Sequence, residues 1–372
     1  MRKVFLFALP LLTFFAPALS RLHLRPTDAA RHGAVEAAAL APDQLALSAL
    51  HARIREARAL LDAQTPAPAD TVALVVAAAA DAPLQVLQVP KALFTSQDAE
   101  TLVRTAGGAP LRLRVVRANY VNTAVAVTDA AGRALEPLLV RYPVEKQGAL
   151  SEVAYYTSAH PALAQPALAR AGGAYVRRTL DAAAARLAGQ GVRIAPDVVA
   201  VAERLAVVEH ADHKRFATED HATLFDEIRT LYALNAGDTY RYSVSTAGAG
   251  GMIQMIPQTY QAVRAQHPAA NLDADFVAGM RDHENAARAM LLYMQDTWDG
   301  LLRSEEVRQA LATGLATQAE LLAAGYNSNP ARLPSYLKRG GAGWRALIPA
   351  ETQTYLRIYA AVDSLAPAAS RS

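Results

Sequence analysis

One glutamate lies where a carboxyl group can act as an acid. The segment that begins near Asp197 has apolar residues spaced three and four apart, which predicts a helix with one apolar stripe. Glu209 ends this stripe, four residues after Leu205, whereas Glu203 lies on the wet face. A carboxyl in apolar surroundings has a raised pKa and stays protonated near neutral pH, as the general acid of glycosidic cleavage must. The alternative is a structural ion pair at a helix end.

An amide inside an apolar, glycine-rich run is the second candidate. In "GAGGMIQMIP" (248–257), Gln254 stands between two Met-Ile pairs. A buried amide without hydrogen-bond partners costs about 1–3 kcal/mol. Gln254 therefore either has protein partners or faces a polar ligand, which the glycines would allow to come close to the backbone.

Metal, cofactor and nucleophile chemistry have weaker support. The run "EHADH" (209–213) places His210 and His213 three residues apart, whereas helical zinc sites usually show H-E-x-x-H with a spacing of four. The chain has no cysteine, and "GYNSN" (325–329) lacks the G-x-S-x-G pattern. "GAGG" lacks the context of a phosphate-binding loop. We expect no metal and no cofactor.

The elements around these residues are expected to be mainly α. Alanine is frequent, and helical spacing recurs from about residue 160 onward. We predict a helix and linker in 21–70, a small β-rich domain in 71–150, and a helical domain in 160–366. The β-rich domain is expected from the runs "TVALVV", "LQVLQV", "LRLRVV" and "TAVAVT", with a turn at "DAAGRA". An immunoglobulin-like sandwich is one arrangement that fits, with a binding or spacer role.

The N-terminal residues 1–20, "MRKVFLFALPLLTFFAPALS", have the basic start, apolar run and small residues of a cleaved signal peptide. The alternative is a membrane anchor, but the run is short and Pro10 interrupts it, so we expect no stable anchor. The absence of cysteine fits a periplasmic protein. The formal net charge is +3 with scattered positive residues, so we expect no nucleic-acid partner.

Four fragments occur in the order of the elements of one enzyme family. They are "YSVSTAGAGGMIQMIPQTY" (242–260), "RDHENAARAMLLYM" (281–294), "AAGYNSNPAR" (323–332) and "IPAETQTYLRIY" (348–359). Together they resemble the soluble lytic transglycosylase family, which has a serine before Gly-Ala-x-Gly, a hydrophobic pair and Gln, then Ala-x-Tyr-Asn and Pro-x-Glu-Thr-x-x-Tyr. The resemblance covers about 197–364 and does not reach the β-rich domain.

The resemblance implies a lysozyme-like helical catalytic domain in 160–366. It implies cleavage of the β-1,4 bond between N-acetylmuramic acid and N-acetylglucosamine in peptidoglycan glycan strands, with a 1,6-anhydro product. Glu209 corresponds to the catalytic glutamate, which acts as acid and then as base. The substrate-binding positions correspond to Ser245, Met252, Gln254, Tyr326 and Asn327. The β-rich domain could then dock a cell-envelope protein.

This chain departs from the family pattern in two ways. The family's glutamate is usually followed by serine, and here His210 follows. Glu209 also precedes Ser245 by 36 residues, so an insertion that contains a helix at 219–235 must loop out and return. Glu219 is the alternative acid, although its place after Thr218 indicates a helix start.

Two other functions remain open. A hydrolytic lysozyme would need a second carboxylate to activate water, and Asp238 or Asp282 could supply it. A peptidoglycan-binding protein without catalysis would have no need of the acid.

Overall fold

The computed structural model describes residues 47–64, 68–79, 81–146, 148–158, 163, 165–237 and 247–365. The expected signal peptide (1–20), residues 21–46 and Ser245 lie outside the described residues. All described residues belong to one compact unit of the chain.

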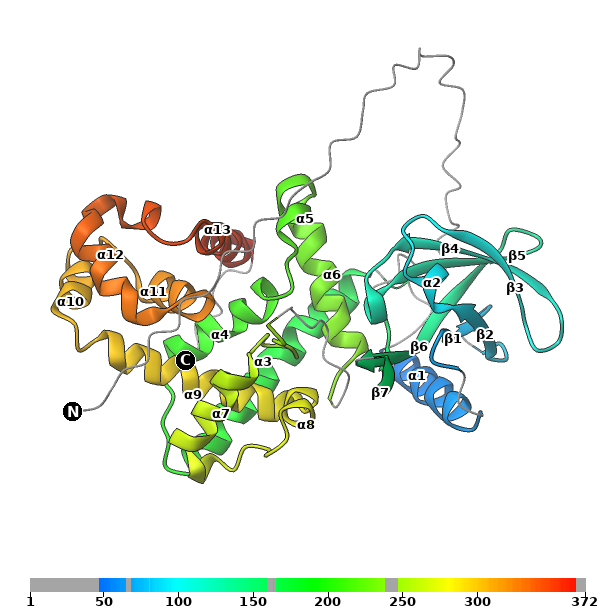
Figure 1. Cartoon of the computed structure of the whole chain (residues 1–372), viewed down its shortest axis with the longest axis horizontal. Helices are drawn as coiled ribbons and strands as arrows, with labels where there is room; N and C mark the ends of the chain where they lie inside the picture. The colour runs from blue at the N-terminus through cyan, green and yellow to red at the C-terminus, as the bar shows by residue number, and fades with distance from the viewer. Residues whose placement is uncertain are drawn as a thin grey trace, which may run out of the picture. The chain divides into compact units, whose positions relative to one another are not determined.

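A seven-stranded antiparallel sheet occupies residues 71–156 (Figure 1). Its strands are β1 Thr71–Ala77, β2 Gln85–Pro90, β3 Glu100–Arg104, β4 Pro110–Arg117, β5 Ala124–Asp129, β6 Ala134–Lys146 and β7 Ala149–Tyr156. The order is β2-β1-β6-β5-β4-β3, and β7 pairs with β6. The short helix α2 Lys91–Phe94 and the turn η1 Tyr120–Asn122 complete this part.

The helix α1, Leu47–Asp62, packs on one face of the sheet. Leu50 and Leu61 of α1 share a core with Val75 of β1 and Leu138 of β6. The opposite face of β1 is also buried, which explains why "TVALVV" is continuously apolar rather than alternating.

The rest of the described chain is helical. Its helices are α3 Pro166–Gly189, α4 Pro196–Val208, α5 His213–Thr218, α6 His221–Leu234, α7 Pro257–Gln266, α8 Phe276–Arg281, α9 His283–Leu301, α10 Glu305–Ala312, α11 Gln318–Asn327, α12 Leu333–Gly340 and α13 Ala350–Leu365. Three 3₁₀ turns lie between them, η3 Pro268–Ala270, η4 Pro330–Arg332 and η5 Gly341–Ala346. The helix α9 is buried along most of its length, so it forms the centre of this part.

Several helix starts follow from their capping residues. The Asp282 carboxylate accepts hydrogen bonds from two backbone N–H groups at the start of α9. Thr317 and Glu320 form a capping box at the start of α11. Asp220, rather than Thr218, caps α6, because Thr218 is the last residue of α5.

The expected fold class, a mainly α, lysozyme-like chain with a small β-rich domain before it, is wrong. The structure is mixed α and β, because β6 is 13 residues long and pairs with β1, β5 and β7. The sheet extends past residue 150 and shares a hydrophobic core with the helices. Asn235, just after α6, exchanges two hydrogen bonds with the backbone of Thr157, at 2.9 and 2.6 Å. The sheet is therefore a substantial part of the fold, and it is one sheet rather than a sandwich of two.

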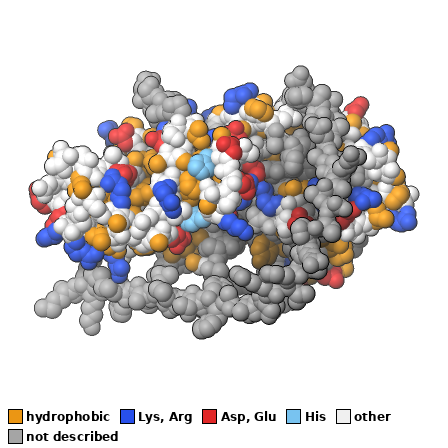
Figure 2. Space-filling model, turned by 90° about the horizontal axis from the view of Figure 1, so that it is seen from above, with side chains coloured by type: hydrophobic (Ala, Val, Ile, Leu, Met, Phe, Trp, Pro, Cys, Tyr) orange, Lys and Arg blue, Asp and Glu red, His pale blue; other side chains and the backbone are white. Residues whose placement is uncertain are grey.

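Charged side chains are mixed on the surface. On the face shown in Figure 2, described Lys and Arg residues are interspersed with Asp and Glu rather than gathered into one basic area. Within the part of the chain that the structure describes, no helix combines the length and apolar character needed to cross a bilayer.

Candidate active site

Glu209 lies at the C-terminal end of α4. Its backbone N–H still bonds to the Leu205 carbonyl at 2.9 Å, so the side chain continues the apolar stripe of the helix as predicted. Leu205 and Val208 beside it are fully or almost fully buried. The helix therefore directs this carboxyl toward packed side chains.

Burial raises the pKa of the Glu209 carboxyl to about 8, and the nearby Glu351 carboxylate adds to the rise. The Tyr355 hydroxyl, which donates a hydrogen bond to Glu209 Oε1, opposes it. Because the removal from water is the larger effect, Glu209 is mostly protonated at neutral pH. The group can donate a proton there and can accept one again, as a general acid and base must.

The helix α13 positions the partners of this acid. Tyr355 is almost fully buried, so its hydroxyl holds Oε1 from within the packed helices. One turn earlier, Thr352 donates a hydrogen bond to Asn327 Oδ1 at 2.8 Å. This bond ties the end of α11 to α13, and it brings the predicted residues Tyr326 and Asn327 beside the helix that supports Glu209.

The glycine-methionine loop, residues 248–256, folds back on itself. The Gly250 N–H bonds to the Met255 carbonyl at 3.2 Å. Gln254 has φ +46°, in the left-handed region, and its Nε2 donates to the Gly251 carbonyl at 2.9 Å. Gly251 has φ +77°, and a Cβ there would lie 2.9 Å from the Met280 carbonyl oxygen, so only glycine fits.

Side chains from α6, from α11 and from the turn after α4 hold this loop from outside. The Met252 carbonyl accepts from His210 Nε2 at 3.2 Å and lies 3.0 Å from the Tyr232 hydroxyl of α6, which also bonds to the Ala206 carbonyl at 2.6 Å. The Ile253 carbonyl accepts from the Tyr326 hydroxyl at 2.6 Å. Burial raises the pKa of Tyr326, and the nearby Glu209 charge adds to the rise, so this tyrosine lies near the acid as well as the loop.

The structure thus brings four of the predicted residues into one neighbourhood: Glu209, Gln254, Tyr326 and Asn327. Met252 belongs to the same loop, but its side chain is fully buried and contributes to the core. The part of Met252 that reaches the site is its carbonyl. Ser245 lies outside the described residues.

Two residues near the acid were not predicted. Tyr355 and Glu351 both stand in the fragment "IPAETQTYLRIY", which was recognised as an element without a role for either residue. Their spacing of four puts them on one side of α13, which was the available signal. The sequence could not show that this side meets Glu209, 146 residues earlier.

The alternative carboxylates have other partners. Arg215 pairs with Glu219 at 2.7 Å and lowers the pKa of that carboxyl, so Glu219 is ionised and unsuited as an acid. Asp282 is engaged as the cap of α9. Asp238 lies outside the described residues. Among the described residues, no cluster of three or more potential metal ligands occurs, and His210 faces the Met252 carbonyl.

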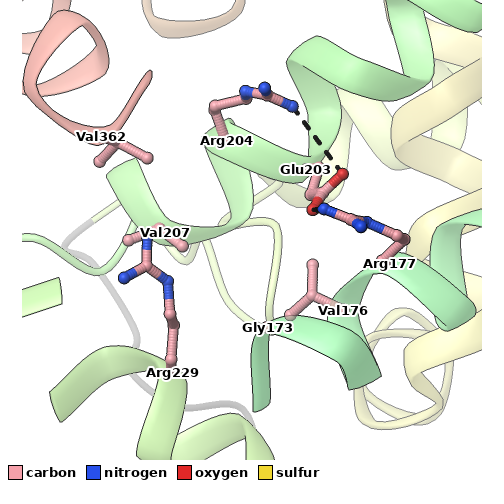
Figure 3. Close-up of a pocket in the computed structure, with 8 residues that line it drawn as sticks. All are labelled: Gly173, Val176, Arg177, Glu203, Arg204, Val207, Arg229 and Val362. Atoms are coloured by element: carbon pink, nitrogen blue, oxygen red, sulfur yellow. Dashed lines mark hydrogen bonds and ion pairs between the residues drawn. The ribbon is translucent and has the colours of Figure 1, made fainter. Parts of the chain in front are cut away.

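A separate pocket lies between α3, α4, α6 and α13 (Figure 3). Its arginines meet carboxylates: Arg177 pairs with Glu203, Arg204 with Asp363 and Arg229 with Asp226, each at 2.9 Å. Val207 lines the pocket two residues before Glu209, and helical residues two apart do not face each other. The pocket therefore opens away from the Glu209 carboxyl. The positive charges of its three arginines are balanced by the carboxylates that pair with them.

We predict that Tyr355→Phe raises the pKa of Glu209 further, because the hydroxyl bond that stabilises the carboxylate is lost. In any reaction that takes its proton from this carboxyl, the alkaline limb of the pH–rate profile should move above about pH 8, and kcat should fall about tenfold because the carboxyl is less well oriented. Tyr359→Phe, one turn along α13, is the matched control and should leave both unchanged. An alkaline limb that stays in place, or moves to lower pH, would contradict this role.

The arrangement described so far is a protonated carboxyl, a tyrosine that orients it, and a strained loop that the next residue, His210, contacts at the Met252 carbonyl. Such a set can protonate a leaving group and take the proton back. Comparison of the chain with family models, with curated proteins and with solved structures finds no match.

Proposed function

We propose that the protein is a peptidoglycan lytic transglycosylase that cleaves the β-1,4 bond between N-acetylmuramic acid and N-acetylglucosamine and leaves a 1,6-anhydro end. The observation that carries this proposal is the Glu209 carboxyl, with a pKa of about 8 and one oriented oxygen beside the Gln254 loop. The order of the four fragments in the sequence supports the same activity.

In the first step, protonated Glu209 donates its proton to the glycosidic oxygen. The bond from that oxygen to the anomeric carbon of N-acetylmuramic acid breaks, and N-acetylglucosamine leaves as an alcohol. The substrate's own N-acetyl oxygen meets the positive charge at the anomeric carbon, a substrate-assisted exception to the two-carboxylate scheme.

In the second step, the ionised Glu209 accepts the proton of the C6 hydroxyl. The C6 oxygen attacks the anomeric carbon, displaces the N-acetyl oxygen and closes the anhydro ring. The Tyr355 hydroxyl stabilises the carboxylate formed between the steps. Positioned acid and base transfer contributes roughly 10²–10⁴ in rate, and distortion of the bound glycan supplies the rest.

The loop supplies the contacts to the glycan. Gln254 keeps one amide N–H on the Gly251 carbonyl, which fixes the direction of the rest of the amide toward an acetamido or hydroxyl group. Asn327 is held by Thr352, and Ser245 is a further contact in this proposal. The enzyme needs no metal or cofactor for these steps.

The setting proposed is the periplasm, reached by way of the signal peptide at 1–20. The partners are peptidoglycan glycan strands. The sheet in 71–156 is proposed as a docking module for a cell-envelope protein, and deletion of that segment would test it through localisation.

Product analysis tests the proposed reaction. The purified chain is incubated with sacculi, and the soluble products are examined by mass spectrometry. Anhydro ends, which are one water lighter than reducing ends, are the expected result. Reducing ends would instead indicate a hydrolytic lysozyme, for which the exposed Glu351 beside the acid is the available second carboxylate. Binding to sacculi without product release would indicate a protein that only binds peptidoglycan.

A further inference from the structure

His210 and Tyr232 act together on one backbone atom, the Met252 carbonyl oxygen. The tyrosine hydroxyl shares its proton between this oxygen, at 3.0 Å, and the Ala206 carbonyl oxygen of α4, at 2.6 Å, and His210 Nε2 lies 3.2 Å from the Met252 oxygen. The two rings meet edge to face, with centroids 5.9 Å apart at 83°. We call this pair the Met252 clamp.

The loop that the clamp holds is under backbone strain. Gln254 adopts a left-handed conformation that costs a non-glycine residue about 1–2 kcal/mol. Gly251 cannot move toward α8, because the Met280 carbonyl is already close to it. Hydrogen bonds from outside the loop must therefore oppose its relaxation.

The histidine also connects the loop to the acid through the chain itself. His210 follows Glu209 directly, so one helix end carries both the carboxyl and one half of the clamp. The other half comes from α6, which lies in the insertion between Glu209 and the loop. The spacing between the Glu209 carboxyl and the loop therefore depends on the peptide bond that joins Glu209 to His210 and on the imidazole ring that reaches the Met252 carbonyl.

We propose that His210 and Tyr232 are positioning residues, which hold the Met252 carbonyl so that the Gln254 amide stays in register with Glu209. The inference rests on the proposed function, because it takes Glu209 as the acid and Gln254 as a substrate contact.

The chemical state of His210 fits this task. A carbonyl oxygen can only accept, so Nε2 carries the proton. Burial lowers the pKa of His210 to about 4, so the ring is neutral between about pH 4 and pH 8, where Glu209 still holds its proton. His210 is therefore a neutral donor and not a second acid.

Three variants test the clamp. His210→Leu removes a donor, His210→Gln replaces it with an amide N–H of similar reach, and Tyr232→Phe removes the hydroxyl that Met252 shares with the Ala206 carbonyl. KM and kcat are measured on soluble peptidoglycan fragments. We expect His210→Leu to raise KM about tenfold with a smaller change in kcat, and His210→Gln to recover most of the loss. Because both donors serve one carbonyl, the effects of His210→Leu and Tyr232→Phe should not multiply.

A matched control and a second readout complete the test. His221→Leu also removes a histidine–carbonyl contact, from Nε2 to the Phe216 carbonyl at 3.0 Å, and it should leave KM unchanged. Methyl NMR of the six methionines reports the loop through Met252 and Met255 without any need for activity. Their signals should shift in His210→Leu and stay in place in His221→Leu.

The outcomes separate the two proposals. The clamp would be overturned if the parent releases anhydro products and His210→Leu changes neither KM nor the methyl signals. It would also be overturned if His210→Gln is as impaired as His210→Leu. If the parent chain releases no product but the methyl signals shift in His210→Leu, the proposed function is overturned. The role of the clamp in holding the loop then still stands.

Discussion

We expect Glu209→Gln to abolish the proposed release of anhydro products from sacculi and to make the folded chain more stable at neutral pH. The amide keeps the shape of the carboxyl and can still accept the Tyr355 hydroxyl bond, but it cannot donate an acid proton. We expect the rate to fall by roughly 10³-fold or more. Assay of the soluble products by mass spectrometry measures this loss.

The gain in stability follows from the raised pKa. The native chain holds the Glu209 proton up to about pH 8, whereas an unfolded glutamate loses it near 4.5. Unfolding therefore releases a proton in this window, and the free energy of unfolding falls as the pH rises through it. Glutamine does not titrate, so the free energy of unfolding of the variant does not fall in this way. The variant should exceed the parent by roughly 1–3 kcal/mol near neutral pH, with the difference vanishing toward pH 4.5.

Urea unfolding at several pH values measures the difference. Glu203→Gln is the matched control, because Glu203 lies on the same helix and pairs with Arg177 at 2.9 Å. It should retain activity and gain no stability. Activity in Glu209→Gln would remove this residue from the acid role. A difference in stability that does not vary with pH would show that the carboxyl is not held protonated.

Gly172→Ala destabilises the fold, although alanine is the better helix former. Helices α3 and α6 meet at this glycine, where a Cβ would lie 1.7 Å from the Arg229 carbonyl oxygen. Backbone cannot move aside as a side chain can, so the helices must separate. We expect a loss of about 2–3 kcal/mol in the free energy of unfolding, after the helix propensity of alanine has offset part of the cost.

The neighbouring glycine supplies the control. A Cβ at Gly173 would meet only the flexible Arg229 side chain, 3.8 Å away at Cδ. Gly173→Ala should therefore stabilise the chain by about 0.5–1 kcal/mol through helix propensity alone. Circular dichroism during urea unfolding measures both variants. A Gly172→Ala chain as stable as the parent would contradict the close approach of α3 and α6.

Local signals were sufficient for most helices and for several strands. Helix-period spacing with Pro196 at its start predicted α4, and alternation predicted β4 and β5. The run of β3 and the first part of β7 are less apolar, and their side chains are mostly exposed, so the pattern did not reveal these strands. The fold class was missed because the extent of a sheet depends on long-range pairing, such as that of β6 with three other strands.

The candidate site shows the same difference between local features, which could be predicted, and long-range contacts, which could not. The position of Glu209 at the inner end of a helix could be predicted, since it depends only on the period of that helix. The contact with Tyr355 could not, because it joins residues far apart in the chain. Gln254 was expected to need polar partners, but its left-handed backbone and the two donors on the Met252 carbonyl are tertiary features.

The great separation in sequence between Glu209 and Tyr355 has a consequence for biosynthesis. After Glu209, the ribosome has to add 146 further residues to reach Tyr355, whose hydroxyl orients the carboxyl. A nascent chain, or one clipped ahead of α13, carries the acid without its orienting group. Under the proposed function, the enzyme would therefore reach its full rate only after synthesis has passed α13 and this helix has docked.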